Sequence, residues 1–96
     1  MQLEIDREKF LVIKDSEEFN LPRKEFEILW LLCTVPGKVF SRKIIFDNVW
    51  GNKSLSQERT VDVHIVNIRK KLGSALIRTI KGVGYKMALD NIHVKI

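Results

Sequence analysis

The sequence has little cysteine, little proline and no long apolar run. Cys33 is the only cysteine, so an internal disulfide is excluded, and its apolar surroundings indicate a small core residue rather than a reactive thiol. The longest uninterrupted apolar run, residues 28–33, is far shorter than the roughly 20 residues that a membrane helix needs. No signal peptide is visible. We therefore expect a soluble, cytoplasmic protein with no membrane partner.

Patterns that carry catalysis or bind metals are also missing. The two histidines, His64 and His93, lie far apart in the sequence and far from Cys33, without the spacing of metal ligands. No Ser/His/Asp set and no pair of carboxylates points to catalysis. A chain of 96 residues is enough for one domain with a modest core, but it leaves little room for a catalytic cleft. We expect no enzymatic activity, no metal and no cofactor.

The basic residues are unevenly distributed. Lys and Arg number 17 against 12 Asp and Glu, a net charge of +5. Residues 1–37 contain five basic and eight acidic side chains, whereas residues 38–88 contain eleven basic and three acidic ones. A concentrated positive field attracts polyanions, and neutralised phosphates release counterions. Nucleic acid is therefore the leading partner class, with an anionic membrane surface as its competitor.

Residues 59–72, followed by Gly73, form the most informative stretch. Apolar residues recur there at steps of four, three and four, which predicts an α-helix with one buried stripe: Val61, Ile65, Ile68 and Leu72. The adjacent face carries hydroxyl, methyl, amide and cationic groups, on Thr60, Val63, His64, Asn67, Lys70 and Lys71. Such groups suit base edges and phosphates. Ser56 is expected to cap the start of this helix and Gly73 to end it.

The preceding residues predict short strands and two more helices. Residues 1–21 alternate short apolar pieces with polar clusters, as in an antiparallel meander of strands, and the acidic outer surface is interpreted as solvated. A first helix is expected from Pro22 to Thr34, before Pro36-Gly37, and a second one begins with Ser41 as its cap. Their predicted core residues are Phe26, Leu29, Trp30, Leu32, Cys33, Ile45, Phe46 and Val49.

After Gly73 the pattern changes to β-type segments at residues 76–81 and 85–87. They are joined across Gly82-Val83-Gly84, which fits a hairpin whose turn needs positive φ at its glycines. A phosphate-binding loop is the weaker interpretation, because no third glycine and no helix follow. Residues 89–96 fit either a further strand or an ordered tail.

This order of elements predicts the α+β fold of a winged helix-turn-helix protein. It has an N-terminal antiparallel sheet, a three-helix core and a C-terminal β-hairpin, the wing. We expect a single domain over residues 1–96, divided into a meander at 1–21, three helices at 22–73, the wing at 76–88, and a tail or strand at 89–96.

Several motifs, in this order, resemble the DNA-binding effector domain of OmpR/PhoB-type response regulators. The resemblance covers residues 3–88, nearly the whole chain. Its motifs are Glu25-Phe26-Glu27-Ile28-Leu29, Val39-Phe40-Ser41-Arg42, Val49-Trp50-Gly51, Arg59-Thr60-Val61-Asp62-Val63-His64-Ile65, Ile68-Arg69-Lys70-Lys71-Leu72-Gly73 and Thr79-Ile80-Lys81-Gly82-Val83-Gly84-Tyr85.

The resemblance implies a transcription regulator of a two-component phosphorelay, which binds double-stranded DNA with the third helix in the major groove and the wing in the minor groove. The base-facing positions are Thr60, Val63 and Asn67, and the wing position is Lys81. The phosphate-binding positions are Arg42, Trp50, Arg59, His64, Arg69, Thr79 and Tyr85, joined by Lys70 and Lys71 from the helical face. Helical geometry groups Arg69 with Asp62 and Val66, so Arg69 can instead pair with Asp62 or another carboxylate. Trp50 can instead be a core anchor.

The chain departs from the family pattern at three places. Val66 and Asn67 stand where some relatives have two arginines, which removes a possible guanine contact and leaves an amide better suited to adenine. Lys81 replaces the usual wing arginine, and a point charge has a weaker preference for a narrow groove. Pro22 replaces a threonine that often starts the first helix, so that cap comes from elsewhere or is missing.

The resemblance also implies partners beyond DNA. They are an N-terminal receiver domain, which is not visible in these 96 residues, a second copy arranged head to tail on direct repeats, and RNA polymerase at the loop of residues 51–57. The alternative interpretation is a winged helix used as a protein-interaction module, which an outward-facing Val66 and the 51–54 loop would favour. DNA binding predicts a steep loss of affinity with salt and a preference for one site, whereas an interaction module predicts neither.

Overall fold

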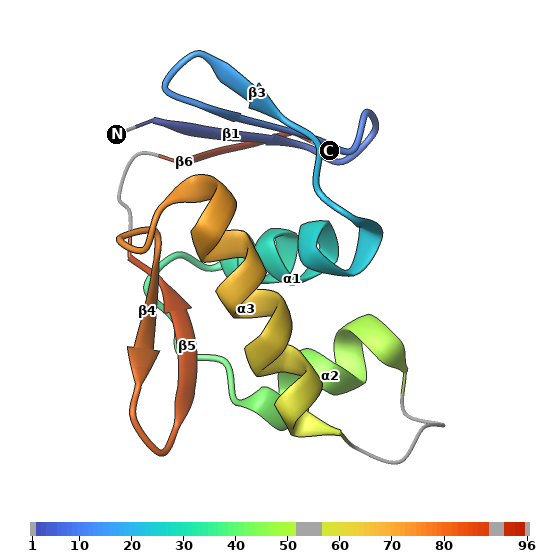
Figure 1. Cartoon of the computed structure of the whole chain (residues 1–96), viewed down its shortest axis with the longest axis vertical. Coiled ribbons are helices and arrows are strands. Elements are labelled where there is room, and N and C mark those ends of the chain that lie inside the picture. Colours follow the sequence, from blue (N-terminus) through green and yellow to red (C-terminus); the bar gives the residue numbers. More distant parts are fainter. Residues whose placement is uncertain (1, 52–56, 89–91, 96) are drawn as a thin grey trace.

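Three helices lie between a sheet at one end and a β-hairpin at one side in the computed structural model, which describes residues 2–51, 57–88 and 92–95 (Figure 1). The helices are α1 (Arg23–Thr34), α2 (Arg42–Trp50) and α3 (Glu58–Leu72). The strands are β1 (Leu3–Asp6), β2 (Leu11–Lys14), β3 (Glu17–Phe19), β4 (Ile77–Ile80), β5 (Gly84–Met87) and β6 (Ile92–Lys95). The predicted α+β winged helix-turn-helix arrangement is confirmed.

The N-terminal sheet contains the predicted meander and one additional strand. Its order is β3-β2-β1-β6, with antiparallel β1–β2 and β2–β3 pairs, and β6 lies parallel to β1. A parallel neighbour needs a long crossover, and here all three helices and the wing lie between the two strands. The strand interpretation of the C-terminal segment is therefore correct for residues 92–95, while residues 89–91 and 96 lie outside the described part.

The first two helices begin close to where the sequence predicts. Pro22 directly precedes α1 rather than starting it, and it gives no side-chain cap. Of the two outcomes expected where Pro22 replaces threonine, the structure therefore shows the missing cap. Ser41 caps α2 as predicted, because its Oγ accepts a hydrogen bond from the Ile44 N–H at 3.1 Å. α1 packs against both other helices and against strands of both sheets, which places it at the centre of the core.

α3 begins one residue earlier than predicted and ends at Gly73 as expected. Gln57 flanks its start without a side-chain cap, and the predicted cap residue, Ser56, lies outside the described residues. Gly73 has φ of +97°, a value that favours glycine, and its N–H donates to the Arg69 carbonyl at 2.8 Å. The predicted apolar stripe of α3 is confirmed, since all four of its residues are buried.

The wing corrects one expectation about its glycines. Only Gly82 takes positive φ, +76°, in the turn, whereas Gly84 lies in β5 without positive φ. A Cβ on Gly84 would lie 2.1 Å from the Phe40 carbonyl oxygen, because the backbones of Phe40 and Tyr85 form a β-bridge beside it. Gly84 is therefore needed for close approach of the wing to the segment before α2, and not for the turn.

The predicted core residues of α1 are buried, except that Trp30 is partly buried against the core. Cys33 is buried, as expected, and burial raises the pKa of its thiol to about 12. Trp30 packs against the core with part of its side chain exposed, and the guanidinium carbon of Arg7 lies 5.1 Å from its ring centroid. Ile28, which was not among the predicted core residues, is also fully buried.

Among the described residues, no helix combines the length and the apolar character needed to cross a bilayer.

Candidate nucleic-acid interface

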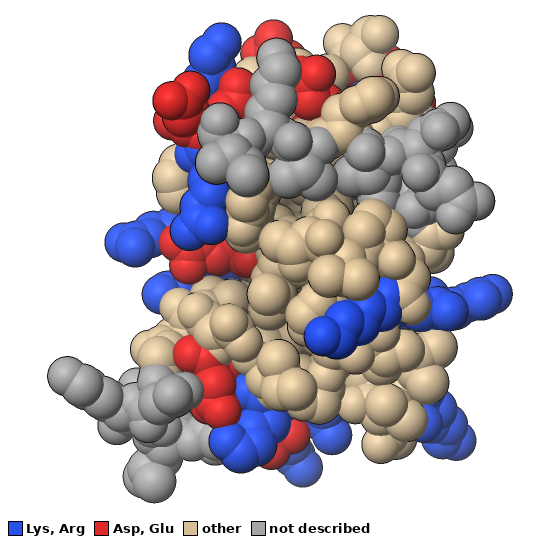
Figure 2. All heavy atoms as spheres, turned by 180° about the vertical axis from the view of Figure 1, so that it is seen from behind, with Lys and Arg blue, Asp and Glu red and all other residues tan. Residues whose placement is uncertain are grey.

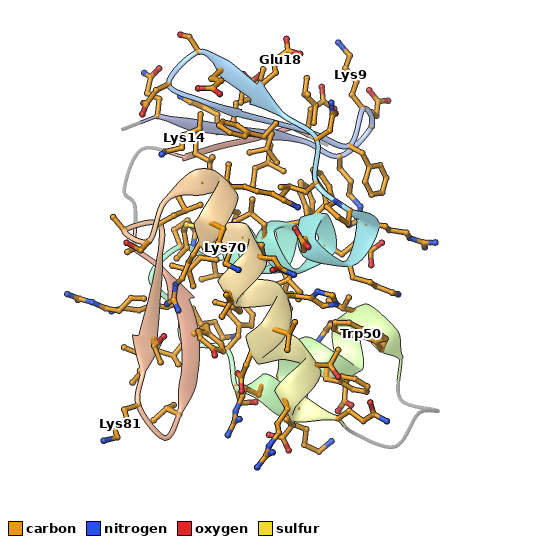
Figure 3. All side chains as sticks on the ribbon, in the orientation of Figure 1. Lys9, Lys14, Glu18, Trp50, Lys70 and Lys81 are labelled. Atoms are coloured by element: carbon orange, nitrogen blue, oxygen red, sulfur yellow. The ribbon has the colours of Figure 1, made fainter. Side chains whose placement is uncertain are left out.

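The outward face of α3 is open along most of its length. Val63 is 58% exposed, and Thr60 and Asn67 beside it are partly exposed. Arg59 and Lys70, toward the two ends of the helix, are exposed cations, and Figure 3 shows the position of Lys70 on α3. The structure therefore brings together, on one helical face, the three residues that the sequence predicts as base-facing.

The side of α3 that faces the wing is occupied by internal contacts. The Arg69 Nη2 donates to the Ile77 carbonyl at 2.7 Å and to the Thr79 Oγ1 at 2.8 Å. The Arg69 guanidinium carbon also lies 5.7 Å from the centroid of the Tyr85 ring. The alternative that Arg69 pairs with Asp62 is therefore wrong. Arg69 instead fixes β4 and β5 to α3, and its predicted phosphate contact stays a prediction.

Asp62 connects α3 to α2 and to the second strand of the wing. Its Oδ2 accepts from the Arg42 Nη1 of α2 at 3.0 Å, and its Oδ1 accepts from the Tyr85 hydroxyl of β5 at 2.5 Å. Burial of the Tyr85 phenol, and then its hydrogen bond to Asp62, raise the pKa of Tyr85 to about 12. Sequence reasoning considered Asp62 only as a partner of Arg69. Its actual partners lie 20 and 23 residues away, and no local pattern connects them to it.

A stack of aromatic rings supports the other flank of α3. The Trp50 ring lies between the rings of Phe46 and His64, with centroids 5.0 and 5.3 Å away and nearly parallel planes. The Lys24 Nζ lies 5.5 Å from the Trp50 ring centroid. Trp50 packs partly buried against the core, so the core-anchor interpretation is confirmed, and its phosphate contact is untested. The Nδ1 of His64 is enclosed and has no hydrogen-bond partner among the described residues.

The two lysines at the end of α3 have different surroundings. Lys71 donates from its Nζ to Glu25 Oε1 of α1 at 2.9 Å, and Glu25 is only 4% exposed. Lys70 is exposed and takes part in no ion pair that the described residues show. Lys71 therefore connects α3 to α1, a role that sequence reasoning missed because 46 residues separate the partners.

A pocket separates the wing from the start of α3. Its volume is about 290 Å³, and it includes Arg42 on one side and the wing turn on the other. Lys81 lies at the tip of the hairpin and points away from the body of the protein (Figure 3). The pocket is thus lined by two basic residues, Arg42 and Lys81, and by two acidic residues of α3, Glu58 and Asp62.

On the face of the molecule seen from behind, the basic side chains of the described residues are dispersed, and uncharged side chains cover a broad central area (Figure 2). In the part of the chain that the structure describes, no group of three or more His, Cys, Asp or Glu residues could hold a metal ion.

These features together define a winged helix-turn-helix domain, since an exposed third helix with basic residues near both ends of its outward face is flanked by a β-hairpin. Residues 16–87 match the family model described as "Transcriptional regulatory protein, C terminal". The chain therefore belongs to this family, the OmpR/PhoB-type DNA-binding domains of response regulators, as the motifs indicated.

Curated relatives agree with the family assignment. The chain is 43% identical over 89 residues to the phosphate regulon transcriptional regulatory protein PhoB of Rhizobium meliloti, covering 88% of this chain and 39% of that protein. It is 45% identical over 76 residues to the heme response regulator HssR of Staphylococcus saprophyticus, covering 75% of this chain and 34% of that protein. The chain thus spans less than two fifths of the length of these relatives.

Solved structures agree with the fold. The DNA-binding domain of Bacillus subtilis CssR matches with a TM-score of 0.81 and 30% identity, covering 90% of this chain and 99% of that one. The Klebsiella pneumoniae RstA DNA-binding domain in complex with the RstA box matches with a TM-score of 0.81 and 31% identity, covering 92% of each chain.

Proposed function

We propose that this domain binds double-stranded DNA in a sequence-specific manner and serves as the output domain of a two-component response regulator that controls transcription. The observation that carries the proposal is the outward face of α3, where Thr60, Val63 and Asn67 are accessible while the apolar stripe on the other side is buried. The membership of the family and the similarity to domains solved with DNA support it.

The major groove fits α3 in size and chemistry. The groove is about 12 Å wide and accepts an α-helix, whose side chains can then meet the base edges. In this arrangement Thr60, Val63 and Asn67 face the bases. Arg59 and Lys70, at the edges of the same face, reach the phosphates on either side of the groove.

The remaining phosphate contacts surround this face. Trp50 and His64 lie on one side of the proposed path of the duplex. The wing side has Arg42, Arg69, Thr79 and Tyr85. Lys81 at the wing tip enters the adjacent minor groove and contributes affinity more than selectivity, because its ammonium is a compact, strongly hydrated charge. Lys71 contributes less than its charge suggests, since it is engaged by Glu25.

Binding measured against salt and against competitor DNA tests this proposal. Preferred sites are selected from random duplexes, and fluorescence anisotropy then gives the affinity for the best site and for a shuffled duplex. We expect the logarithm of affinity to fall linearly with the logarithm of salt concentration, and the best site to bind at least about 10³-fold more tightly than shuffled DNA. Equal affinity for both duplexes would refute sequence-specific binding.

One observation favours the alternative function, a protein-interaction module. Val66 is 48% exposed on α3, as the sequence predicted, and an exposed apolar side chain can contact a protein. That function predicts little salt dependence and no selected site. The same anisotropy experiment therefore separates the two functions.

Further partners follow from the family and belong to the proposal. A receiver domain joined ahead of β1 would be attached at the sheet, at the opposite end from the wing tip and the start of α3 (Figure 1). This leaves the DNA-facing side free.

Three further expectations follow from the family. Two copies are expected to bind head to tail on direct repeats about one helical turn apart. RNA polymerase is expected to contact the loop of residues 51–57, and the regulator is expected to act in the cytoplasm.

A further inference from the structure

Two exposed valines lie together in the middle of the outward face of α3. Val63 is 58% exposed and Val66 is 48% exposed, although every other apolar residue of the helix is buried. Residues three and four apart are neighbours on a helix. Val66 and Asn67, which follow Val63 by three and four residues, therefore lie beside it on the helix surface. The centre of this face therefore consists of two methyl-bearing side chains and one amide.

The cations of the same face lie outside this centre. Arg59 precedes Val63 by one helical turn, and Lys70 follows Val66 by one turn. A guanine is best recognised by arginine or lysine, which donate to its O6 and N7. No such donor occupies positions 63, 66 or 67, so the centre of α3 offers guanine no matching partner.

Thymine offers the apolar group that these valines match. In the major groove it carries the C5-methyl group, and apolar side chains recognise thymine through this methyl. Val63 and Val66 are separated by about 4.5 Å along the helix axis, close to the roughly 3.4 Å between neighbouring bases of one strand. The flanking cations favour a polyanion over an apolar protein surface as the occupant.

We propose that Val63 and Val66 recognise the C5-methyl groups of two neighbouring thymines, with Asn67 on an adenine, so that the centre of each half-site is an A·T step. This inference rests on the proposed function and specifies its substrate. Val66 is then a residue that determines specificity, rather than an exposed side chain without a partner.

Removal of single methyl groups from DNA tests the inference directly. In the selected duplex, each thymine in turn is replaced by deoxyuridine, which lacks only the C5-methyl. We expect two central positions at which replacement weakens binding by about two- to fourfold each, since burial of one methyl group corresponds to about fourfold. Deoxyuridine outside the half-sites should have no effect.

Variants then connect each methyl group with one valine. In Val66→Ala, the penalty for one deoxyuridine should vanish while the penalty for the other remains, and Val63→Ala should show the reverse. Val35→Ala is the matched control, because Val35 is also 48% exposed but follows α1. It should keep both penalties. A selected thymine replaced by cytosine should weaken binding, and 5-methylcytosine at that position should restore part of the affinity.

The outcomes separate this inference from the proposed function. A selected site with no thymine at its centre, or a site whose deoxyuridine penalties persist unchanged in both alanine variants, would overturn the inference and leave sequence-specific binding intact. The absence of any selected site would overturn the proposed function itself. Penalties that disappear with their paired valine would establish the methyl contacts.

Discussion

On the wing side of α3, polar side chains are paired within the protein, whereas on the outward side they are open. Asp62 is bound by Arg42 and Tyr85, and Arg69 is bound by Ile77 and Thr79. Thr60, Asn67 and Lys70 have no side-chain hydrogen bond to other described residues. The first side fixes the distance between helix and wing, and the second is available to a partner. This contrast predicts that changes on the two sides have different effects.

The attachment of the wing should be the most sensitive to change. In Gly84→Ala, the new Cβ would overlap the Phe40 carbonyl oxygen, which is backbone and cannot turn aside. We expect the free energy of unfolding to fall by about 3 kcal/mol, the upper part of the range for overpacking. Urea denaturation measures this change. Gly82→Ala is the control, because its site is open and only the positive φ is strained, which costs about 1 kcal/mol. Equal losses in the two variants would contradict the close approach at Gly84.

The outward side should affect recognition without affecting stability. Asn67→Ala is expected to reduce discrimination at one base pair by about 1–3 kcal/mol, because a bidentate amide contact to adenine is lost. Its free energy of unfolding should change by less than about 0.5 kcal/mol, as at other surface positions. Anisotropy on duplexes that differ at single positions, together with urea denaturation, measures both. Unchanged base preference in this variant would remove Asn67 from base recognition.

The two lysines at the end of α3 allow the same comparison between neighbouring residues, because Lys71 is paired within the protein and Lys70 has no such partner among the described residues. Lys71→Ala leaves the buried Glu25 without its partner, so we expect a loss of about 1–2 kcal/mol in stability, less than for a fully buried pair because Lys71 is half exposed. Lys70→Ala should leave stability unchanged and reduce the slope of affinity against salt by about one unit. Thermal and urea denaturation, with salt titrations, compare the variants. The reverse pattern would mean that Lys71 is the phosphate contact.

The smallest expected effect concerns the Tyr85 phenol. Its pKa is raised from 10.0 to about 12, so the contribution of this group to stability is complete below pH 10 and is lost as the pH rises toward 12. Tyr85→Phe should cost about 1 kcal/mol at pH 8 through the missing hydrogen bond to Asp62. The difference between the wild type and this variant should narrow by pH 11. Lysines also titrate in this range, but they are common to both proteins, and Tyr85 is the only tyrosine. A difference that is constant with pH would contradict the raised pKa.

The parts of the fold that sequence could predict depend on local periodicity. Apolar residues at steps of four, three and four identified the buried stripe of α3. The positions on the opposite side of the helix then identified its outward face. Ser41 and Gly73 were predictable because a helix cap depends on a few adjacent residues. The family motifs then assigned contacts with DNA to residues of the wing, and these assignments stay predictions.

The parts that sequence could not predict depend on contacts between distant residues. The parallel pairing of β6 with β1 joins the two ends of the described chain. The roles of Asp62 and Glu25 depend on partners 20 to 46 residues away. Gly84 was predicted to be a turn glycine, because the local sequence does not indicate that the Phe40 backbone lies beside it. Local patterns therefore identified which side chains face outward, but not which of them form hydrogen bonds or ion pairs within the protein.

Amide and methyl chemical-shift mapping by NMR, with the protein titrated by its selected duplex, tests the central claim most directly. The account predicts that the largest changes fall on the Asn67 side-chain amide, the Val63 methyl groups and the wing tip around Lys81. The strands of the N-terminal sheet should change little. Large changes confined to that sheet, with the outward face of α3 unaffected, would contradict the account.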